Sequence, residues 1–155
     1  NLFKLFQNDV GLLACQYAAG LQIKLLSGET TINYGAIYEN YVAQELFAHG
    51  FGGHDHSLYY FNNKKQGELD FIVEHDGKIL PIEVKSGKDY DRHKALKNVM
   101  QNADYGIERA IVFCNGNVER KENITYLPIY MTMFLEKRQP QAKQDFHLDL
   151  SGLTV

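Results

Sequence analysis

The sequence predicts an α/β fold, because a β-hairpin, a helix and a buried strand can each be recognised along the chain. Residues 69–85 are two apolar segments joined by Asp76 and Gly77, a pair typical of a type I′ turn. Residues 35–49 carry a helical pattern of apolar positions. Residues 109–114 form a short apolar run, which is typical of a strand buried on both faces of a sheet.

The other segments predict shorter elements and one domain. Gly50 stands where a helix over 35–49 would end. We expect a domain over residues 1–137 and a C-terminal tail over 138–155. The remaining predicted elements are a strand at 2–6, a helix from Asp9 to 19, strands at 58–61 and 124–127, a helix at 92–102, a polar connection at 115–123, and a helix with Pro128 at its first position.

Composition restricts the classes of function. The chain has 155 residues, which suits one hydrophobic core, and its apolar runs fall far short of the ~20 residues that span a bilayer. A formal net charge of -3 argues against strong nucleic-acid binding by the whole surface, so such binding requires a local patch. Cys15 and Cys114 lack the spacing of metal ligands, which favours a cytoplasmic location and a place in the core for both.

The chain begins at Asn1 and continues at once with a structured pattern. This start favours a fragment of a longer protein. The alternative is a processed form of a complete small protein.

The hairpin predicts which side chains meet. A two-residue turn places Asp70 opposite Glu83 and Glu68 opposite Lys85, and directly paired residues point to the same face. A three-residue turn would shift this register by one residue. The opposite face is expected to be apolar and to pack into the core: Leu69, Phe71, Val73, Leu80, Ile82 and Val84.

Carboxylates and a lysine on one face suggest metal-assisted chemistry. Asp70 and Glu83 would repel each other by up to ~1 kcal/mol, and a divalent cation removes that repulsion. Lys85 is placed to stabilise developing charge or to position a water molecule. Glu39 lies near the apolar stripe of its helix, where a carboxylate needs a partner or a metal. The alternative is an exposed, salt-bridged hairpin end.

The helix that carries Glu39 also has a polar side. Asn40 and Gln44 are one turn apart and are expected to mark its solvent-exposed face.

These residues resemble a known motif. Residues 68–70 (ELD) followed by residues 83–85 (EVK) resemble the PD-(D/E)XK signature of restriction-endonuclease-like and Holliday-junction-resolvase-like proteins. Glu39 matches the helix glutamate that many of these proteins carry. The resemblance implies a restriction-endonuclease-like core, with a mixed β-sheet flanked by helices. Leu69 replaces the usual proline, which removes no ligand.

A longer ordered set of motifs is similar to a narrower family, the C-terminal domain of unknown function that follows a P-loop AAA-type ATPase in many prokaryotic proteins. Those motifs lie at residues 9–13, 35–40, 68–72 and 81–87. The resemblance covers residues 2 to about 130 and implies an N-terminal ATPase domain of the same polypeptide as partner. This chain has no GxxxxGK[ST] motif, so we do not expect it to bind ATP in the P-loop manner.

Taken residue by residue, the resemblance implies a Mg²⁺ or Mn²⁺ site. It implies Asp70 and Glu83 as metal ligands, Glu39 as a further ligand or a water-positioning acid, and Lys85 as the charged catalytic partner.

Two further groups are open to more than one interpretation. His54, Asp55 and His56 could bind a transition metal, but histidines in a glycine-rich loop are more often solvated. Basic residues near the proposed site could contact DNA phosphates or could simply form a solvated face. They are Lys64, Lys65, Lys88, Arg92, Lys94 and Lys97.

The sequence therefore favours a Mg²⁺-dependent DNA phosphodiesterase domain. The alternative is a catalytically silent module that binds nucleic acid or a partner and regulates the ATPase. A plain protein-interaction domain is a third hypothesis.

Overall fold

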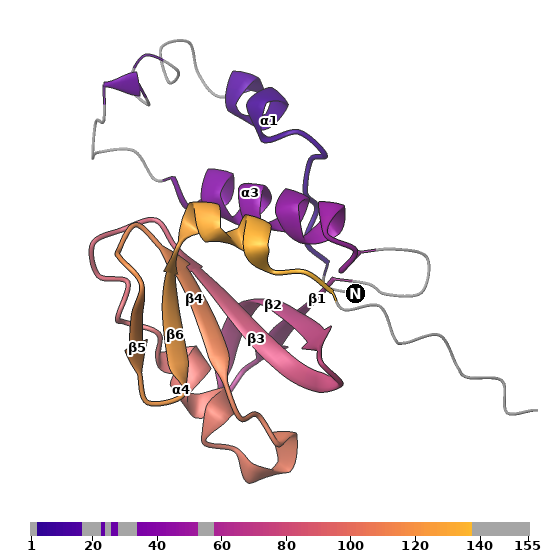
Figure 1. Ribbon diagram of the computed structural model, residues 1–155, viewed down its shortest axis with the longest axis vertical. Helices are drawn as coiled ribbons and strands as arrows, with labels where there is room; N and C mark the ends of the chain where they lie inside the picture. Colours follow the sequence, from indigo (N-terminus) through magenta and orange to yellow (C-terminus); the bar gives the residue numbers. More distant parts are fainter. Residues whose placement is uncertain (1–2, 17–22, 24–25, 28–33, 53–57, 138–155) are drawn as a thin grey trace, which may run out of the picture.

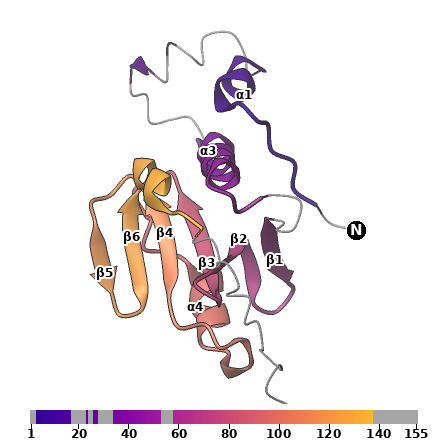
Figure 2. The ribbon, with the colours of Figure 1, turned by 45° about the vertical axis from the view of Figure 1, so that its right-hand side comes forward.

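The structure is a computed structural model, described here for residues 3–16, 23, 26–27, 34–52 and 58–137. A six-stranded sheet has the order β1-β2-β3-β4-β6-β5. Helices α3 and η2 lie on one face and α4 on the other (Figure 1, Figure 2). The elements are α1 (Val10–Gln16), α3 (Gly35–Ala48), β1 (Tyr59–Asn63), β2 (Gly67–His75), β3 (Lys78–Lys85), α4 (Lys94–Met100), η1 (Ala103–Tyr105), β4 (Ala110–Cys114), β5 (Glu119–Lys121), β6 (Ile124–Pro128) and η2 (Ile129–Phe134).

The sheet is mixed, which confirms the predicted α/β class. Strands β1, β2 and β3 pair antiparallel, whereas β3, β4 and β6 pair parallel. The short β5 pairs antiparallel with β6 at the far edge. Among the described residues, no helix has the length and apolar character needed to cross a membrane.

The hairpin has the predicted turn. Asp76 and Gly77 have φ values of 56° and 73°, the left-handed conformation that both central residues of a type I′ turn require. Pairing runs from this turn to Phe71 opposite Ile82, as a two-residue turn demands. The predicted register is therefore confirmed over this stretch.

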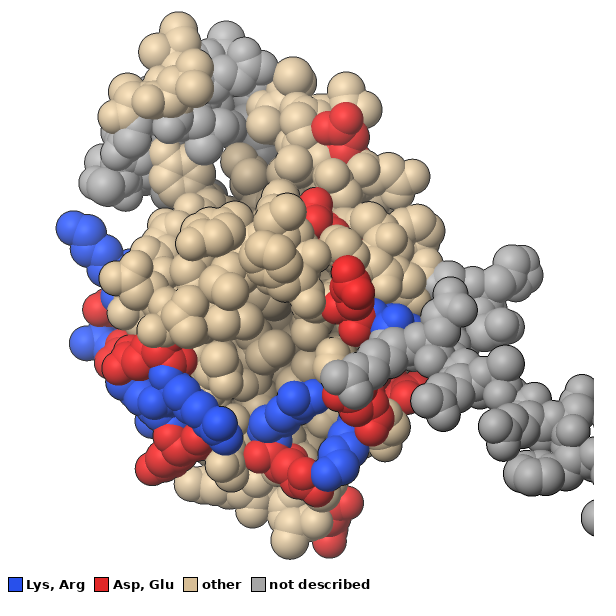
Figure 3. Space-filling model, in the orientation of Figure 1, with Lys and Arg blue, Asp and Glu red and all other residues tan. Residues whose placement is uncertain are grey.

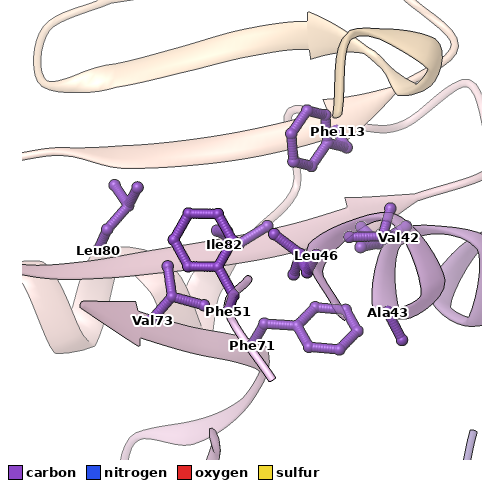
Figure 4. Packing of buried hydrophobic residues seen from close by; sticks show 10 residues of the cluster. Val42, Ala43, Leu46, Phe51, Phe71, Val73, Leu80, Ile82 and Phe113 are labelled. Carbon is purple, nitrogen blue, oxygen red and sulfur yellow. The ribbon is translucent and has the colours of Figure 1, made fainter. Parts of the chain in front are cut away.

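Two hydrophobic clusters hold the sheet between its helices. The cluster under α3 joins that helix to β2, β3 and β4, and Figure 4 shows its side chains meeting. The cluster under α4 joins that helix to β4 and β6. The first contains Val42, Ala43, Leu46, Phe51, Phe71, Val73, Leu80, Ile82, Val84 and Phe113; the second contains Leu69, Leu96, Val99, Ala110, Val112, Cys114, Ile124 and Tyr126.

The placement of Leu69 corrects one prediction. We expected Leu69 on the same face as Phe71, but it packs in the cluster under α4. Tyr59 pairs with Ile72 while Phe61 pairs with Leu69, so β2 holds one more residue than β1 over this stretch. Such a β-bulge breaks the two-residue alternation on which the prediction rested.

Three boundaries also differ from expectation. The polar connection predicted at 115–123 contains β5, a short edge strand that lacks an apolar pattern. Pro128 ends β6 and precedes the 3₁₀ helix η2, so it does not begin an α-helix. Helix α4 begins at Lys94, two residues later than predicted. The predicted tail over 138–155 lies outside the described residues.

The N-terminal segment and the cysteines need correction as well. Residues 3–8, called the strap below, form no strand. Helix α1 follows at Val10, and the predicted helix end at Gly20 lies outside the described residues. Cys114 is buried in the core as expected, but Cys15 is exposed.

Substitution of Gly67 would test how closely β2 packs against α4. Its φ is 104°, and an added Cβ would lie 2.8 Å from the Cβ of Ala95. Gly67→Ala should lower the free energy of unfolding by about 1–3 kcal/mol, measured by urea denaturation. Gly87→Ala is the control, because nothing lies within 4 Å of its added Cβ. A Gly67 variant no less stable than the control would contradict this packing.

Candidate functional site

Side-chain amides of α3 fasten the strap and the start of α1 to the domain. Asn40 accepts a hydrogen bond from the main-chain N–H of Gln7 at 2.7 Å and donates one to its carbonyl oxygen at 3.0 Å. One turn later, Gln44 accepts a hydrogen bond from the N–H of Val10 at 2.9 Å. Asn40 is only 2% exposed. The prediction that both amides mark a solvent-exposed face is therefore wrong.

The physical reason lies in the amide group itself. An amide that both donates and accepts can pair with a peptide unit as a neighbouring strand would. The ring of Phe6 adds an apolar contact, with its centroid 5.4 Å from that of Phe71. The strap is consequently held over the sheet end where β2 begins.

Lys4 on the strap places its ammonium among three carboxylates. Its Nζ lies 2.9 Å from Glu68 Oε1, 3.3 Å from Asp70 Oδ1 and 3.5 Å from Glu39 Oε2. The ring of Tyr60 lies alongside, with its centroid 5.7 Å from Nζ. Lys4 could not be predicted as part of the site, because no motif or periodicity connects it to residues so far along the chain.

Asp70 links β2 to β3 at the bulge. Its Oδ2 accepts a hydrogen bond from the main-chain N–H of Val84 at 2.8 Å, while Oδ1 faces Lys4. Its side chain is only 14% exposed. Both oxygens of this carboxylate therefore have partners within the domain.

Glu83 and Lys85 form a close pair on β3. Lys85 Nζ donates a hydrogen bond to Glu83 Oε1 at 2.6 Å. The other oxygen, Oε2, is buried and has no hydrogen-bond partner among the described residues. Burial, together with the charge of Asp70, raises the pKa of Glu83 to about 7 despite the opposing effect of Lys85.

Glu39 and Lys4 influence each other's protonation. Burial and the charge of Asp70 raise the pKa of Glu39, and the nearby Lys4 opposes that rise. Burial alone would lower the pKa of Lys4, but the hydrogen bond to Glu68 and the charges of Asp70 and Glu39 outweigh it and raise the pKa. The Lys4 ammonium is thus held in its charged form.

The structure gathers the predicted site residues into two linked groups. Lys4 ties Glu39, Glu68 and Asp70 together, and Lys85 holds Glu83. The charges of Asp70 and Lys4 also act on Glu83, which connects the groups. Fully ionised, the four carboxylates outnumber the two ammonium groups.

The donor atoms suit a hard divalent cation, because Mg²⁺ and Mn²⁺ prefer carboxylate oxygen. Glu83 Oε2, which is buried without a hydrogen-bond partner among the described residues, is an oxygen of this kind. Within the described ranges, however, no three His, Cys, Asp or Glu side chains already stand together as a metal site. The Lys4 ammonium contacts two of the three predicted ligands, Asp70 and Glu39.

The six predicted DNA-contacting residues are all exposed. Lys64 and Lys65 lie in the turn between β1 and β2, which is joined to α4 by a 3.2 Å hydrogen bond from Asn98 to the carbonyl of Gln66. Lys94 and Lys97 lie on α4 itself, while Lys88 and Arg92 precede it. Residues 53–57, including the predicted ligands His54 to His56, lie outside the described residues.

One view of the surface shows a contrast in charge. In Figure 3, Lys and Arg gather in the lower half of the face, interspersed with Asp and Glu. The upper half of the same face shows almost no Lys or Arg, although some Asp and Glu side chains lie there. Arg92 is itself paired with Asp89 at 3.5 Å. The basic residues are therefore partly balanced by neighbouring acids.

These features define an α/β domain with a cluster of carboxylates and lysines at one end of its mixed sheet. The protein-family model described as "Domain of unknown function (DUF4143)" matches residues 34–132, which is more than half of the chain. The chain therefore belongs to this family. No curated protein and no solved structure matches the chain. The matched range includes the four acids and Lys85 but excludes Lys4.

The amides of α3 yield a graded prediction. Asn40→Ala removes two hydrogen bonds to Gln7 at a buried position and should lower the free energy of unfolding by about 1–3 kcal/mol. Gln44→Ala removes one bond and should lower it by about 0.5–1.5 kcal/mol. Urea denaturation measures both. A larger loss from Gln44→Ala would show that the strap is held differently.

The raised pKa of Glu83 predicts how stability depends on pH. Between its ordinary value of 4.5 and about 7, the native protein keeps a proton that the unfolded chain has released. The free energy of unfolding should therefore fall as pH rises through this window, and Glu83→Gln should flatten that fall. Denaturation at about pH 5 and about pH 7.5 measures it. Glu74→Gln, at an exposed position on β2, is the control and should keep the wild-type slope.

Proposed function

We propose that this domain is a Mg²⁺- or Mn²⁺-dependent phosphodiesterase acting on DNA, with a PD-(D/E)XK site on a restriction-endonuclease-like core. The observation that carries the proposal is the convergence of Asp70, Glu83 and Lys85 where β2 and β3 meet, with one buried Glu83 oxygen left open. A structural hairpin end has no need of a buried carboxylate without a partner.

Each residue has a role in this proposal. Asp70 and Glu83 would hold the cation, and Glu39 would supply a further oxygen or position a water molecule. The bound cation would polarise the phosphate and favour ionisation of a water nucleophile. Lys85, fixed by its hydrogen bond to Glu83, would stabilise the negative charge that develops on the phosphate.

DNA is the proposed substrate because exposed lysines flank the same end of the sheet. Lys64 and Lys65 precede β2, and Lys88 follows β3. Contacts from such residues would position the phosphate backbone without reading its sequence. The acidic net charge of -3 favours a short contact surface.

The second candidate is a catalytically silent module that binds nucleic acid or a partner. It is favoured by Lys4, whose ammonium group compensates the charges of Asp70 and Glu39. Under either candidate, we propose that the domain works with an N-terminal P-loop ATPase domain of the same polypeptide in the cytoplasm. That proposal rests on the resemblance of the ordered motifs and on the unclustered cysteines.

Cleavage of a mixed DNA panel with Mg²⁺ or Mn²⁺ tests the proposal. Wild type should cleave, and Asp70→Asn and Lys85→Met should each lose ~100-fold or more in rate, because each removes a group that acts at the phosphate. Lys78→Met is the matched control, since Lys78 is exposed and paired with Glu108. Equal rates for wild type and both site variants would refute the assignment. No cleavage by folded wild type would favour the silent module.

A further inference from the structure

The carboxylate oxygens of the site are unequally available. Lys4 occupies Asp70 Oδ1 and Glu39 Oε2, and the main-chain N–H of Val84 occupies Asp70 Oδ2. Lys85 occupies Glu83 Oε1. Among the described residues, Glu83 Oε2 is the buried carboxylate oxygen without a partner. A cation bound to Asp70 Oδ1 or Glu39 Oε2 would therefore take an oxygen that Lys4 now contacts.

Two cations cannot share these oxygens without a penalty. A divalent ion bound to Asp70 and Glu39 would lie within a few ångströms of the Lys4 ammonium, where like charges repel strongly at a partly buried position. The side chain of Lys4 is only 21% exposed, so solvent screens this repulsion incompletely. Binding of the ion and the present position of Lys4 are therefore opposed.

Space beside the strap would allow the Lys4 side chain to move. A cavity of about 600 Å³ lies between the strap, α1 and α3, lined by Lys4, Gln7 and Glu39 among others. A second, of about 510 Å³, is lined by Phe6, Gln7 and Phe47 among others. The described main-chain hydrogen bonds to α3 are at Gln7 and Val10, beyond Lys4. The Lys4 side chain can therefore leave while those anchors stay.

We propose that Lys4 is a member of the site: a resident cation that competes with the divalent ion for Asp70 and Glu39. It sets the ion concentration at which the site fills. The inference rests on the proposed function for the identity of the ion. Lys4 keeps the acids compensated while the ion is absent, and its displacement accompanies ion binding.

Mn²⁺ binding to the full chain, measured by the loss of the free-ion electron paramagnetic resonance signal, tests this inference. Lys4→Met should bind Mn²⁺ about tenfold or more tightly than wild type, because the competing charge is gone. Lys78→Met removes the same charge from the exposed pair with Glu108 and should bind as wild type does. Lys4→Arg keeps the charge and should stay close to wild type.

A second measurement uses the wild-type chain, so it does not depend on the folding of a variant. Acetylation of each lysine is followed by mass spectrometry with and without saturating Mn²⁺. Displaced Lys4 should react about fivefold faster or more, whereas Lys78 should not change. An unchanged rate at Lys4 with Mn²⁺ bound would overturn the inference.

The outcomes separate this inference from the proposed function. If Lys4→Met binds Mn²⁺ no more tightly than wild type, the competition is refuted and the nuclease proposal stands. If Lys4→Met gains affinity but neither protein cleaves DNA, the competition holds and the nuclease proposal falls. If none of the proteins binds Mn²⁺, both are refuted.

Discussion

Compensation of buried negative charge is the constraint on which this end of the domain depends. Four carboxylates converge where β2 begins and β3 ends. Three of their side chains are less than one-third exposed, at 32%, 14% and 7% for Glu39, Asp70 and Glu83. Such groups need opposite charges, hydrogen-bond donors or protons. The domain uses all three: two lysines, the N–H of Val84 and the raised pKa of Glu83.

The same constraint orders the surrounding structure. Asp70 can accept the Val84 N–H because a bulge in β2 changes the alternation of its side chains, and that bulge sends Leu69 into the cluster under α4. The strap can deliver Lys4 because α3 presents Asn40 and Gln44 toward it. The irregular strand β2 therefore links the packing on both faces of the sheet to the charge balance at its end.

The features that could be predicted from the sequence are those with local determinants. The type I′ turn follows from Asp76 and Gly77 alone, and the register of Phe71 opposite Ile82 follows from the turn. The pairing of Asp70 with Glu83, which this register implies, stays a prediction, because the described pairing ends at Phe71 and Ile82. The bulge was beyond prediction because it depends on how β1 pairs with β2. The exposure of Asn40 was predicted wrongly because its partner, Gln7, lies 33 residues away in the sequence. Lys4 was not predicted because its partner Asp70 lies 66 residues away.

The attachment of the strap has a consequence for what evolution can vary there. Asn40 bonds to the main-chain N–H and carbonyl of Gln7, so this contact fixes a position along the backbone without requiring a particular side chain at residue 7. The number of residues between Gln7 and Lys4 therefore determines where the Lys4 ammonium group lies. One inserted residue would move the ammonium by about 3.3 Å, the rise of extended chain, which is as long as its contact with Asp70. Substitution of the Gln7 side chain should therefore cost little, whereas a change in the length of the segment between Lys4 and Gln7 should cost the contacts that Lys4 makes.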